Sequence, residues 1–331
     1  MNHPIERLCL TLGLGQLCNE PEPISGGLLH TMYHVRTSSG GFAVKLLNPD
    51  IMIRPDAIQN MINSERIARK LQNTVPLVTA KEFDEGTLIA FEGSYYMIFD
   101  WIDGLSIYAP DITAEHCSQI GRILGQIHEA NVRIENSLTC VQMPSHYEWS
   151  NFLEKADQQD SECFDILQSN LQALTRWSER VSHSWSVVSA HQVISHRDLD
   201  PKNVLWANGQ PYLIDWESAG FVNPAQELIE IINYWATGSD GEYCLEKIAH
   251  ILLAYRECNS LSHVNWDAIF DCGFEGMLGW TAYNVRLVLG MEGDGMKDRS
   301  KGLREIKKTL DELYRYDNQT KQLQNYISRY L

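Results

Sequence analysis

The chain has 331 residues, of which 44% are hydrophobic, so it is long enough to bury the cores of two lobes or domains. Its 43 acidic and 27 basic residues give a formal net charge of −16, which opposes binding to nucleic acid or to an anionic membrane surface. The eight cysteines form no C-x-x-C pair, and this argues against both a zinc site and a disulfide framework.

The N-terminal region opens with a short apolar stretch that Glu6 and Arg7 precede, which argues against a secretion signal. No apolar run in the chain approaches the length that spans a membrane. A cytoplasmic protein is therefore expected. The composition gives no indication of an oligomeric state.

A hairpin is predicted over residues 24–35, where the pair Gly26 and Gly27 precedes an alternating strand. Backbone amides near these glycines can approach a phosphate because no side chain blocks them. A Gly-Gly turn is also an ordinary start for any hairpin, and the motif G-x-G-x-x-G is missing. The strand that follows, residues 42–47, contains one charged residue, Lys45, which suits a buried cation directed at nucleotide phosphates.

Residues 55–72 are predicted to form a helix with Pro55 in its first turn. Glu65 falls on or beside the apolar face of this helix, so its carboxylate needs a buried partner. Lys45 is the preferred partner, in an ion pair between a strand lysine and a helix glutamate that orients the lysine. The alternative is a surface pair with Arg69, worth only roughly 0.2–0.5 kcal/mol.

The rest of the first hundred residues is predicted to complete a small antiparallel sheet, with strands at residues 78–83, 87–91 and 95–99. From Thr113, a residue type typical of helix N-caps, the pattern becomes helical. His128 lies at the end of that helix and is interpreted as a hydrogen-bonded structural histidine rather than as a catalyst.

The fold class expected is α+β, with two lobes. Residues 1–103 would form a nucleotide-binding lobe built on the small antiparallel sheet, and residues 104–331 a larger, mainly helical lobe with the catalytic loop and the acceptor site. Residues 145–185 are interpreted as a helical insertion that shapes the acceptor pocket or simply packs. The small-residue helix at 276–285 could line the cleft.

The most specific motif is His196-Arg197-Asp198 followed by Asn203, which has the spacing of the catalytic-loop pattern H-x-D-x-x-x-x-N. Such a loop places a carboxylate against an acceptor hydroxyl and an amide oxygen where it can hold magnesium. Asp215 ends a short apolar strand further along the chain. Magnesium usually takes one or two carboxylates besides phosphate and water, so Asn203 with Asp215 suffices. Each element alone is common in loops and turns, but their order and spacing together indicate a kinase.

In these motifs the chain resembles the aminoglycoside phosphotransferase and choline kinase-like family, small-molecule kinases that share the protein-kinase fold. The resemblance covers most of the chain. It implies that Asp198 is the catalytic base, that Asn203 and Asp215 bind Mg²⁺, and that ATP or GTP is the co-substrate. It also implies a set of nucleotide-binding residues, namely Gly26, Gly27, Lys45, Glu65, Phe99, Asp100, Trp101 and Ile102.

One departure from the family concerns Arg197, because the family usually has glycine between the histidine and the aspartate. Protein kinases have arginine there, where it commonly receives a phosphorylated activation loop. The next predicted helix begins at Pro224, too soon after Asp215 for such a loop or for an A-P-E signature. A peptide-binding platform, and hence a protein kinase, is not expected. The roles of Arg197, Asp200 and Lys202 stay open.

Acidic residues in the C-terminal half, among them Glu217, Glu230 and Glu275, could hold the ammonium groups of an aminoglycoside or an amino alcohol. Acidic surfaces also serve solubility alone, so the charge is a weak guide. The predicted function is transfer of the γ-phosphoryl group of ATP or GTP to a hydroxyl of a small acceptor, an aminoglycoside-type antibiotic being the first choice. A metabolite kinase acting on choline, homoserine or a sugar, and a nucleotide-binding pseudokinase, are the alternatives.

Overall fold

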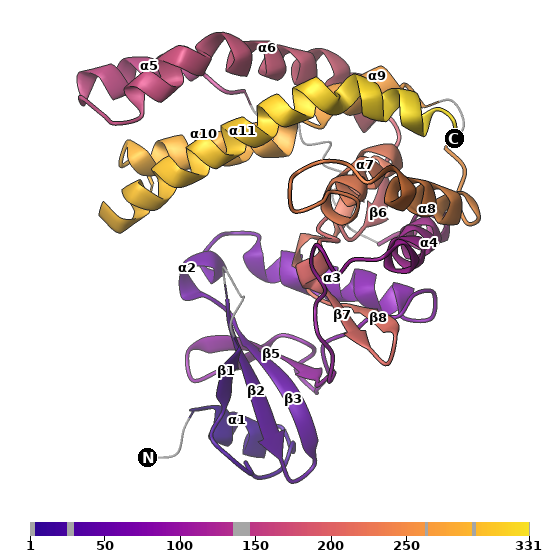
Figure 1. Cartoon of the computed structure of the whole chain (residues 1–331). Helices are drawn as coiled ribbons and strands as arrows, with labels where there is room; N and C mark the ends of the chain where they lie inside the picture. The colour runs from indigo at the N-terminus through magenta and orange to yellow at the C-terminus, as the bar shows by residue number, and fades with distance from the viewer. Residues whose placement is uncertain (1–3, 25–29, 135–145, 262–263, 293–295, 331) are drawn as a thin grey trace.

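The computed structural model describes residues 4–24, 30–134, 146–261, 264–292 and 296–330, which form two lobes (Figure 1). The N-terminal lobe contains a small antiparallel sheet, as predicted, whose five strands lie in the order β1-β2-β3-β5-β4. Its strands are β1 Glu22–Ile24, β2 Thr31–Thr37, β3 Gly40–Leu46, β4 Ile89–Phe91 and β5 Ser94–Asp100. Its helices are α1 Pro4–Thr11, α2 Pro49–Met52 and α3 Ala57–Leu71.

The two faces of this sheet pack against different helices because successive residues of a strand point to opposite sides. Phe42 and Val44 of β3 belong to a buried cluster with Leu8 of α1. Lys45 pairs across the sheet with Met97 of β5, and the Met97 side chain packs in the cluster that contains Met61 of α3. Lys45 therefore lies on the α3 side of the sheet.

The C-terminal lobe is mainly helical, as predicted, with two small antiparallel strand pairs, β6 with β9 and β7 with β8. Its helices are α4 Ala114–Ala130, α5 Trp149–Gln158, α6 Phe164–Ser189, α7 Pro224–Trp235, α8 Leu245–Arg256, α9 Trp266–Cys272, α10 Glu275–Val288 and α11 Met296–Ile327. Its strands are β6 Val193–Ser195, β7 Val204–Ala207, β8 Gln210–Leu213 and β9 Gly220–Val222. The predicted insertion corresponds to α5 and most of α6, which lie along α10 and α11 at the top of the molecule (Figure 1). The division at residues 103 and 104 stays a prediction.

Several predicted boundaries were wrong. Residues 78–83 are not a strand; they follow the sheet only through single contacts, such as the bridge between Ala80 and Phe99. The helix predicted from Pro55 begins at Ala57, and residues 53–56 form turns that join it to a separate short helix, α2. Thr113 is an N-cap as predicted, since its hydroxyl accepts the N–H of His116 at 3.3 Å.

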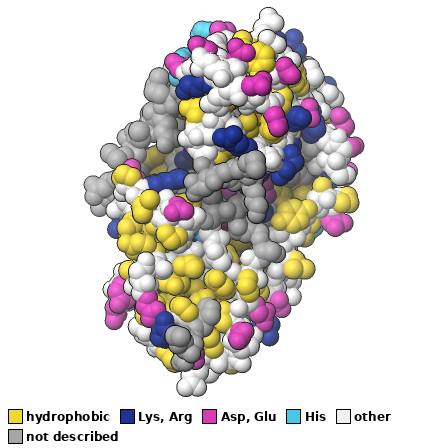
Figure 2. All heavy atoms as spheres, turned by 90° about the vertical axis from the view of Figure 1, so that its left-hand side faces the viewer, with side chains coloured by type: hydrophobic (Ala, Val, Ile, Leu, Met, Phe, Trp, Pro, Cys, Tyr) yellow, Lys and Arg dark blue, Asp and Glu magenta, His cyan; other side chains and the backbone are white. Residues whose placement is uncertain are grey.

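The acidic net charge is unevenly distributed over the surface. Five exposed basic residues lie in the first half of α11, namely Arg299, Lys301, Arg304, Lys307 and Lys308. Figure 2 shows Lys and Arg side chains on the upper, helical part of the face turned to the viewer, and many hydrophobic side chains on its lower part. Net charge alone is therefore a poor guide to the acceptor. In the described part of the chain, no helix is long and apolar enough to cross a membrane.

Candidate active site

The predicted catalytic loop begins directly after β6, where His196 is completely buried. The Nδ1 atom of His196 accepts the backbone N–H of Asp198 at 3.3 Å, so its Nε2–H donates to the carbonyl of Ile214 at 3.0 Å. Burial lowers the pKa of His196, which keeps the ring neutral, as this pair of bonds requires. His196 therefore ties the loop to the segment that contains Asp215.

Arg197 adopts a left-handed backbone conformation, with φ of 65°. For a residue other than glycine this conformation costs roughly 1–3 kcal/mol and requires support from its surroundings. The support comes from α7, because the Arg197 N–H donates to Glu227 Oε1 at 2.7 Å. The left-handed conformation of Arg197 and its bond to Glu227 therefore fix the direction in which the side chain of the next residue, Asp198, projects from the loop.

Glu227 is itself held by a buried chain of hydrogen bonds. Its second oxygen, Oε2, accepts from His128 Nε2 at 2.7 Å, and His128 Nδ1 bonds the Tyr255 hydroxyl at 2.9 Å. The exposed fractions of Glu227, His128 and Tyr255 are 1%, 2% and 0%. The interpretation of His128 as a hydrogen-bonded structural histidine is thus confirmed. Gly125 lets the helices α4 and α8 approach closely, since a Cβ there would lie 2.8 Å from the Tyr255 carbonyl oxygen.

Asp198 and Asn203 are in direct contact. The Asn203 side-chain amide donates to Asp198 Oδ2 at 2.9 Å and to the Asp198 carbonyl at 2.8 Å, and Lys202 Nζ lies 3.3 Å from Asp198 Oδ1. Burial raises the pKa of Asp198, while Lys202 and Asn203 oppose that rise. A carboxylate with a raised pKa suits proton acceptance better than a fully solvated one.

Asp215 also has a left-handed backbone, with φ of 60°, just after β8. Its Oδ1 accepts from Lys45 Nζ at 2.8 Å, and Glu217 Oε2 accepts from the same ammonium group at 2.7 Å. Glu217 Oε2 also lies 3.2 Å from His30 Nε2. Although burial raises it, the pKa of Glu217 falls to about 2 because of His30 and Lys45. Lys45, Asp215 and Glu217 thus form one cluster between the lobes.

The predicted ion pair between Lys45 and Glu65 is not formed. The Glu65 carboxylate instead accepts the backbone N–H of Ala80 at 2.8 Å, and burial raises the pKa of Glu65. Lys45 turns to two carboxylates of the other lobe, which offer it more opposite charge than one glutamate. The surface pair of Glu65 with Arg69 is not formed either, since the guanidinium of Arg69 contacts the Ala80 carbonyl and Glu82.

The remaining nucleotide-binding predictions are not tested by these contacts. Gly26 and Gly27 lie outside the described residues. Phe99 is partly buried against the α3-side cluster, and Asp100 pairs with Lys81 at 2.9 Å. The Trp101 ring stacks on His34 with a centroid distance of 3.7 Å, and Ile102 follows in the segment that joins the lobes. An adenine-binding role for residues 99–102 stays a prediction.

The three predicted acceptor carboxylates have different surroundings. Glu217 lies with Lys45 rather than with an acceptor surface. Glu275 of α10 accepts from the Tyr147 hydroxyl at 3.0 Å. Glu230 of α7 is partly buried and lies one helical turn beyond Glu227, which contacts the loop. Of the three, Glu230 is therefore the one placed beside the catalytic loop.

The donor set fits a magnesium ion that completes its shell with phosphate and water. In the residues described, no group of three or more His, Cys, Asp or Glu side chains could hold a metal ion unaided. Asp215 and Glu217 nevertheless share one cation, so their oxygens lie close together, and Asn203 adds an amide oxygen. Mg²⁺ is commonly bound by one or two carboxylates plus substrate phosphates, so these residues fit it.

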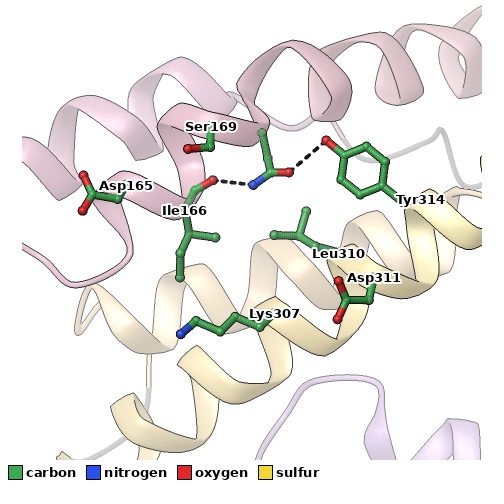
Figure 3. A pocket seen from close by; sticks show the side chains of 8 residues that line it. Asp165, Ile166, Ser169, Lys307, Leu310, Asp311 and Tyr314 are labelled. Carbon is green, nitrogen blue, oxygen red and sulfur yellow. Dashed lines mark hydrogen bonds between the residues drawn. The ribbon is translucent and has the colours of Figure 1, made fainter.

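A separate hollow of about 410 Å³ lies between α6 and α11. Figure 3 shows Asp165 and Ser169 of α6 facing Lys307 and Asp311 of α11 across it. None of the catalytic-loop residues lines this hollow. Substitution of its exposed charged side chains is therefore not expected to affect the catalytic-loop residues.

Residues 20–260 match the phosphotransferase enzyme family, APH. The chain belongs to this family. A homoserine kinase of Chelativorans sp. (strain BNC1) is 27% identical over 240 residues, which are 72% of this chain and 71% of that protein. A homoserine kinase of Rhizobium etli (strain CIAT 652) is 28% identical over 196 residues, which are 59% of this chain and 58% of that protein.

Solved structures of family-like kinases share the fold. A spectinomycin phosphotransferase in complex with ADP and spectinomycin superposes with a TM-score of 0.69 at 14% identity, covering 95% of this chain and 97% of that one. A microcompartment-associated aminopropanol kinase gives 0.63 at 15% identity, covering 96% and 98%. Together with the family match, these likenesses confirm the bilobal kinase-like fold. The chain is a small-molecule kinase, a phosphotransferase with a hydroxyl group as acceptor.

Proposed function

We propose that the chain transfers the γ-phosphoryl group of ATP or GTP to a hydroxyl of a small acceptor that also carries an ammonium group. One continuous set of contacts supports this. Asp198 bonds Asn203, the Asn203 carbonyl accepts the N–H of Ile214 at 3.0 Å, and the adjacent Asp215 meets Lys45. The base, the metal ligands and the phosphate-binding cation thus belong to one hydrogen-bonded unit.

In the proposed reaction the acceptor hydroxyl attacks the γ-phosphorus in line. Its oxygen forms the new P–O bond, its proton passes to Asp198, and the bond from the γ-phosphorus to the bridging oxygen breaks, releasing the nucleoside diphosphate. Lys45 supplies positive charge to the phosphates. Asn203, Asp215 and Glu217 would hold Mg²⁺, which neutralises charge on the phosphates. Most of the rate gain would come from positioning and electrostatics.

The ammonium-binding residue in this proposal is Glu230, because it lies beside the catalytic loop. Two acceptor types have both a hydroxyl and an amine. Relatives named homoserine kinases favour a small metabolite, whereas the spectinomycin phosphotransferase favours an aminoglycoside-type antibiotic. Choline and sugar acceptors remain part of the test.

The test is a coupled nucleotide-turnover assay of the purified protein with Mg²⁺ and either ATP or GTP. The acceptor panel contains aminoglycosides, spectinomycin, homoserine, choline, small amino alcohols and sugars. We expect one class to stimulate turnover, and a chelator to abolish that stimulation. Nucleotide binding without stimulation by any acceptor would favour the pseudokinase alternative and refute the proposal.

A further inference from the structure

The helix α7 lies directly along the catalytic loop. It contacts the loop at two places: Glu227 accepts from the Arg197 N–H at 2.7 Å, and Trp235 Nε1 donates to the Leu199 carbonyl at 2.8 Å. Glu230 and Tyr234 lie on the same side of α7 between these two contacts, because residues three and four apart share a helix face. They therefore lie alongside the part of the loop that contains Asp198.

Tyr234 is 41% exposed at the surface of α7. Burial raises the pKa of Tyr234, and the charges of Glu230 and Asp198 raise it further, which supports the placement of this side chain beside the loop. The surface next to the base thus offers one carboxylate and one aromatic ring to a ligand.

Arg197 adds a guanidinium to this surface. Its side chain is exposed and, in the described part of the chain, makes no hydrogen bond or ion pair. It passes beside Gly220 of β9, where any Cβ would lie 2.9 Å from Arg197 Nη1. The absence of a side chain at Gly220 thus leaves space for this guanidinium. The protein also keeps an arginine at position 197, although its left-handed backbone conformation would be free of strain for glycine.

The other cations near the loop are already paired. Lys202 lies 3.3 Å from Asp198, and Lys45 is held by Asp215 and Glu217. In contrast to these two lysines, Arg197 forms no ion pair with a carboxylate of the described residues. A planar guanidinium binds a carboxylate through two parallel hydrogen bonds.

We infer that Arg197 and Glu230 form a subsite for the two charged groups of a hydroxy amino acid, Arg197 binding its carboxylate and Glu230 its ammonium group. The inference rests on the proposed function, in which Asp198 accepts the proton of the acceptor hydroxyl. The charges of both Arg197 and Asp198 act on the carboxyl of Glu230, so these three groups lie near one another. A short acceptor meets that requirement, whereas a multi-ring aminoglycoside has no carboxylate for Arg197.

The experiment compares three pairs of acceptors that differ only by a carboxylate: homoserine with 3-aminopropan-1-ol, serine with ethanolamine, and threonine with 1-aminopropan-2-ol. The measured quantity is the ratio of kcat/KM within the best-used pair. We expect the wild type to favour the amino acid by about 10-fold or more, the range that loss of a charged hydrogen bond gives.

The variant Arg197→Gly should bring this ratio close to one, and Arg197→Lys should restore part of it. Glycine accepts the left-handed conformation, so thermal unfolding should show a stable fold. Lys307→Ala, which removes an exposed charge beside the hollow of Figure 3, is the control and should leave the ratio unchanged.

A wild-type ratio near one, or a ratio that Arg197→Gly does not alter, would overturn the subsite. Turnover with aminoglycosides alone would also overturn it, while leaving the proposed function intact. Failure of the proposed function is distinct, since the wild type would then show no stimulated turnover with any hydroxyl acceptor.

Discussion

Glu227 and Glu230 lie one turn apart on α7, yet their surroundings give them opposite properties. Both oxygens of Glu227 accept hydrogen bonds, whereas Glu230 makes no hydrogen bond or ion pair with the residues described. Burial raises the pKa of both carboxyls, but His128 and the Arg197 N–H bring the pKa of Glu227 below its usual value. Burial, with the charge of Glu227, raises the pKa of Glu230 to about 8.

The difference teaches that hydrogen-bond partners, rather than depth in the protein, decide whether a buried carboxylate is charged. Glu227 is fully used by the protein and supports the loop. Glu230 keeps its binding capacity for a ligand, and a strongly perturbed group beside a catalytic loop is a good candidate for function. Both carboxylates act on the surroundings of Asp198.

The largest expected effect comes from removing Asp198 itself, the group that both glutamates flank. Asp198→Ala should lower turnover by roughly 10²-fold or more, as loss of a general base commonly does, while nucleotide binding survives. Coupled turnover and nucleotide titration measure the two effects. Asp311→Ala, at an exposed position of α11, is the control. Near-normal turnover of the Asp198 variant would refute its role as base.

The second effect tests Glu227 as the support of the loop. Glu227→Ala leaves the buried Arg197 N–H and His128 without their partner, so unfolding free energy should fall by about 3 kcal/mol. We also expect kcat to fall about 10-fold with little change in the nucleotide KM, because the strained turn at Arg197 loses its support. Urea unfolding and steady-state kinetics measure both.

Glu227→Gln is the matched variant, since its carbonyl can still accept the Arg197 N–H. It should recover most of the lost kcat. If glutamine fails to rescue kcat although stability returns, the role of Glu227 in holding the loop would be disproved.

The H-x-D-x-x-x-x-N motif could be recognised in the sequence because its spacing is local, although the catalytic role of its residues stays a prediction. Asp198 and Asn203 lie within one loop, and the structure brings them into contact as their separation suggests. The antiparallel sheet and the strand that contains Lys45 were also predictable, since apolar alternation marks strands. Binding of adenine by residues 99–102 and of magnesium by Asn203 and Asp215 remain predictions, because the fold alone does not identify the ligands of these residues.

The partners of buried charges were not predictable. Periodicity predicted that Glu65 lies on an apolar helix face, but it could not predict the distance between Glu65 and Lys45. The Glu65 carboxylate instead accepts a hydrogen bond from the backbone N–H of Ala80, which lies in an irregular segment. The bond between His128 and Glu227 joins residues from different helices far apart in the chain. Each of them has the pattern of a polar residue on a buried face, and only the packing of α4 against α7 and α8 brings them together.

The third expected effect concerns Glu230 and has a pH signature. A cationic acceptor needs the charged carboxylate, and the raised pKa means that Glu230 loses its proton only as pH rises through about 8. The kcat/KM of an ammonium-bearing acceptor should therefore rise across this range in the wild type. The nearby charges of Glu227 and Asp198 act in the same direction on this pKa, and Arg197 opposes them.

Glu230→Gln should lower kcat/KM about 10-fold at pH 9, mainly through a higher KM. It should also remove the part of the increase in kcat/KM with pH that comes from ionisation of Glu230. Assaying both proteins side by side accounts for titration of the acceptor amine and of Asp198, which they share. Parallel pH profiles in the two proteins would rule out Glu230 as the ammonium-binding group.

The smallest expected effect comes from Tyr255, the last residue in the series of hydrogen bonds that supports Glu227. Tyr255→Phe removes only the hydroxyl that bonds His128 Nδ1, so unfolding free energy should fall by about 1 kcal/mol. Turnover should change less than about threefold, because His128 and Glu227 keep their direct bond. Tyr326→Phe, which loses a hydroxyl bonded to the Leu245 carbonyl, is the matched control. A turnover loss as large as that of Glu227→Ala, with stability intact, would contradict this expectation. It would mean that the Tyr255 hydroxyl is as important for the position of the loop as Glu227 itself.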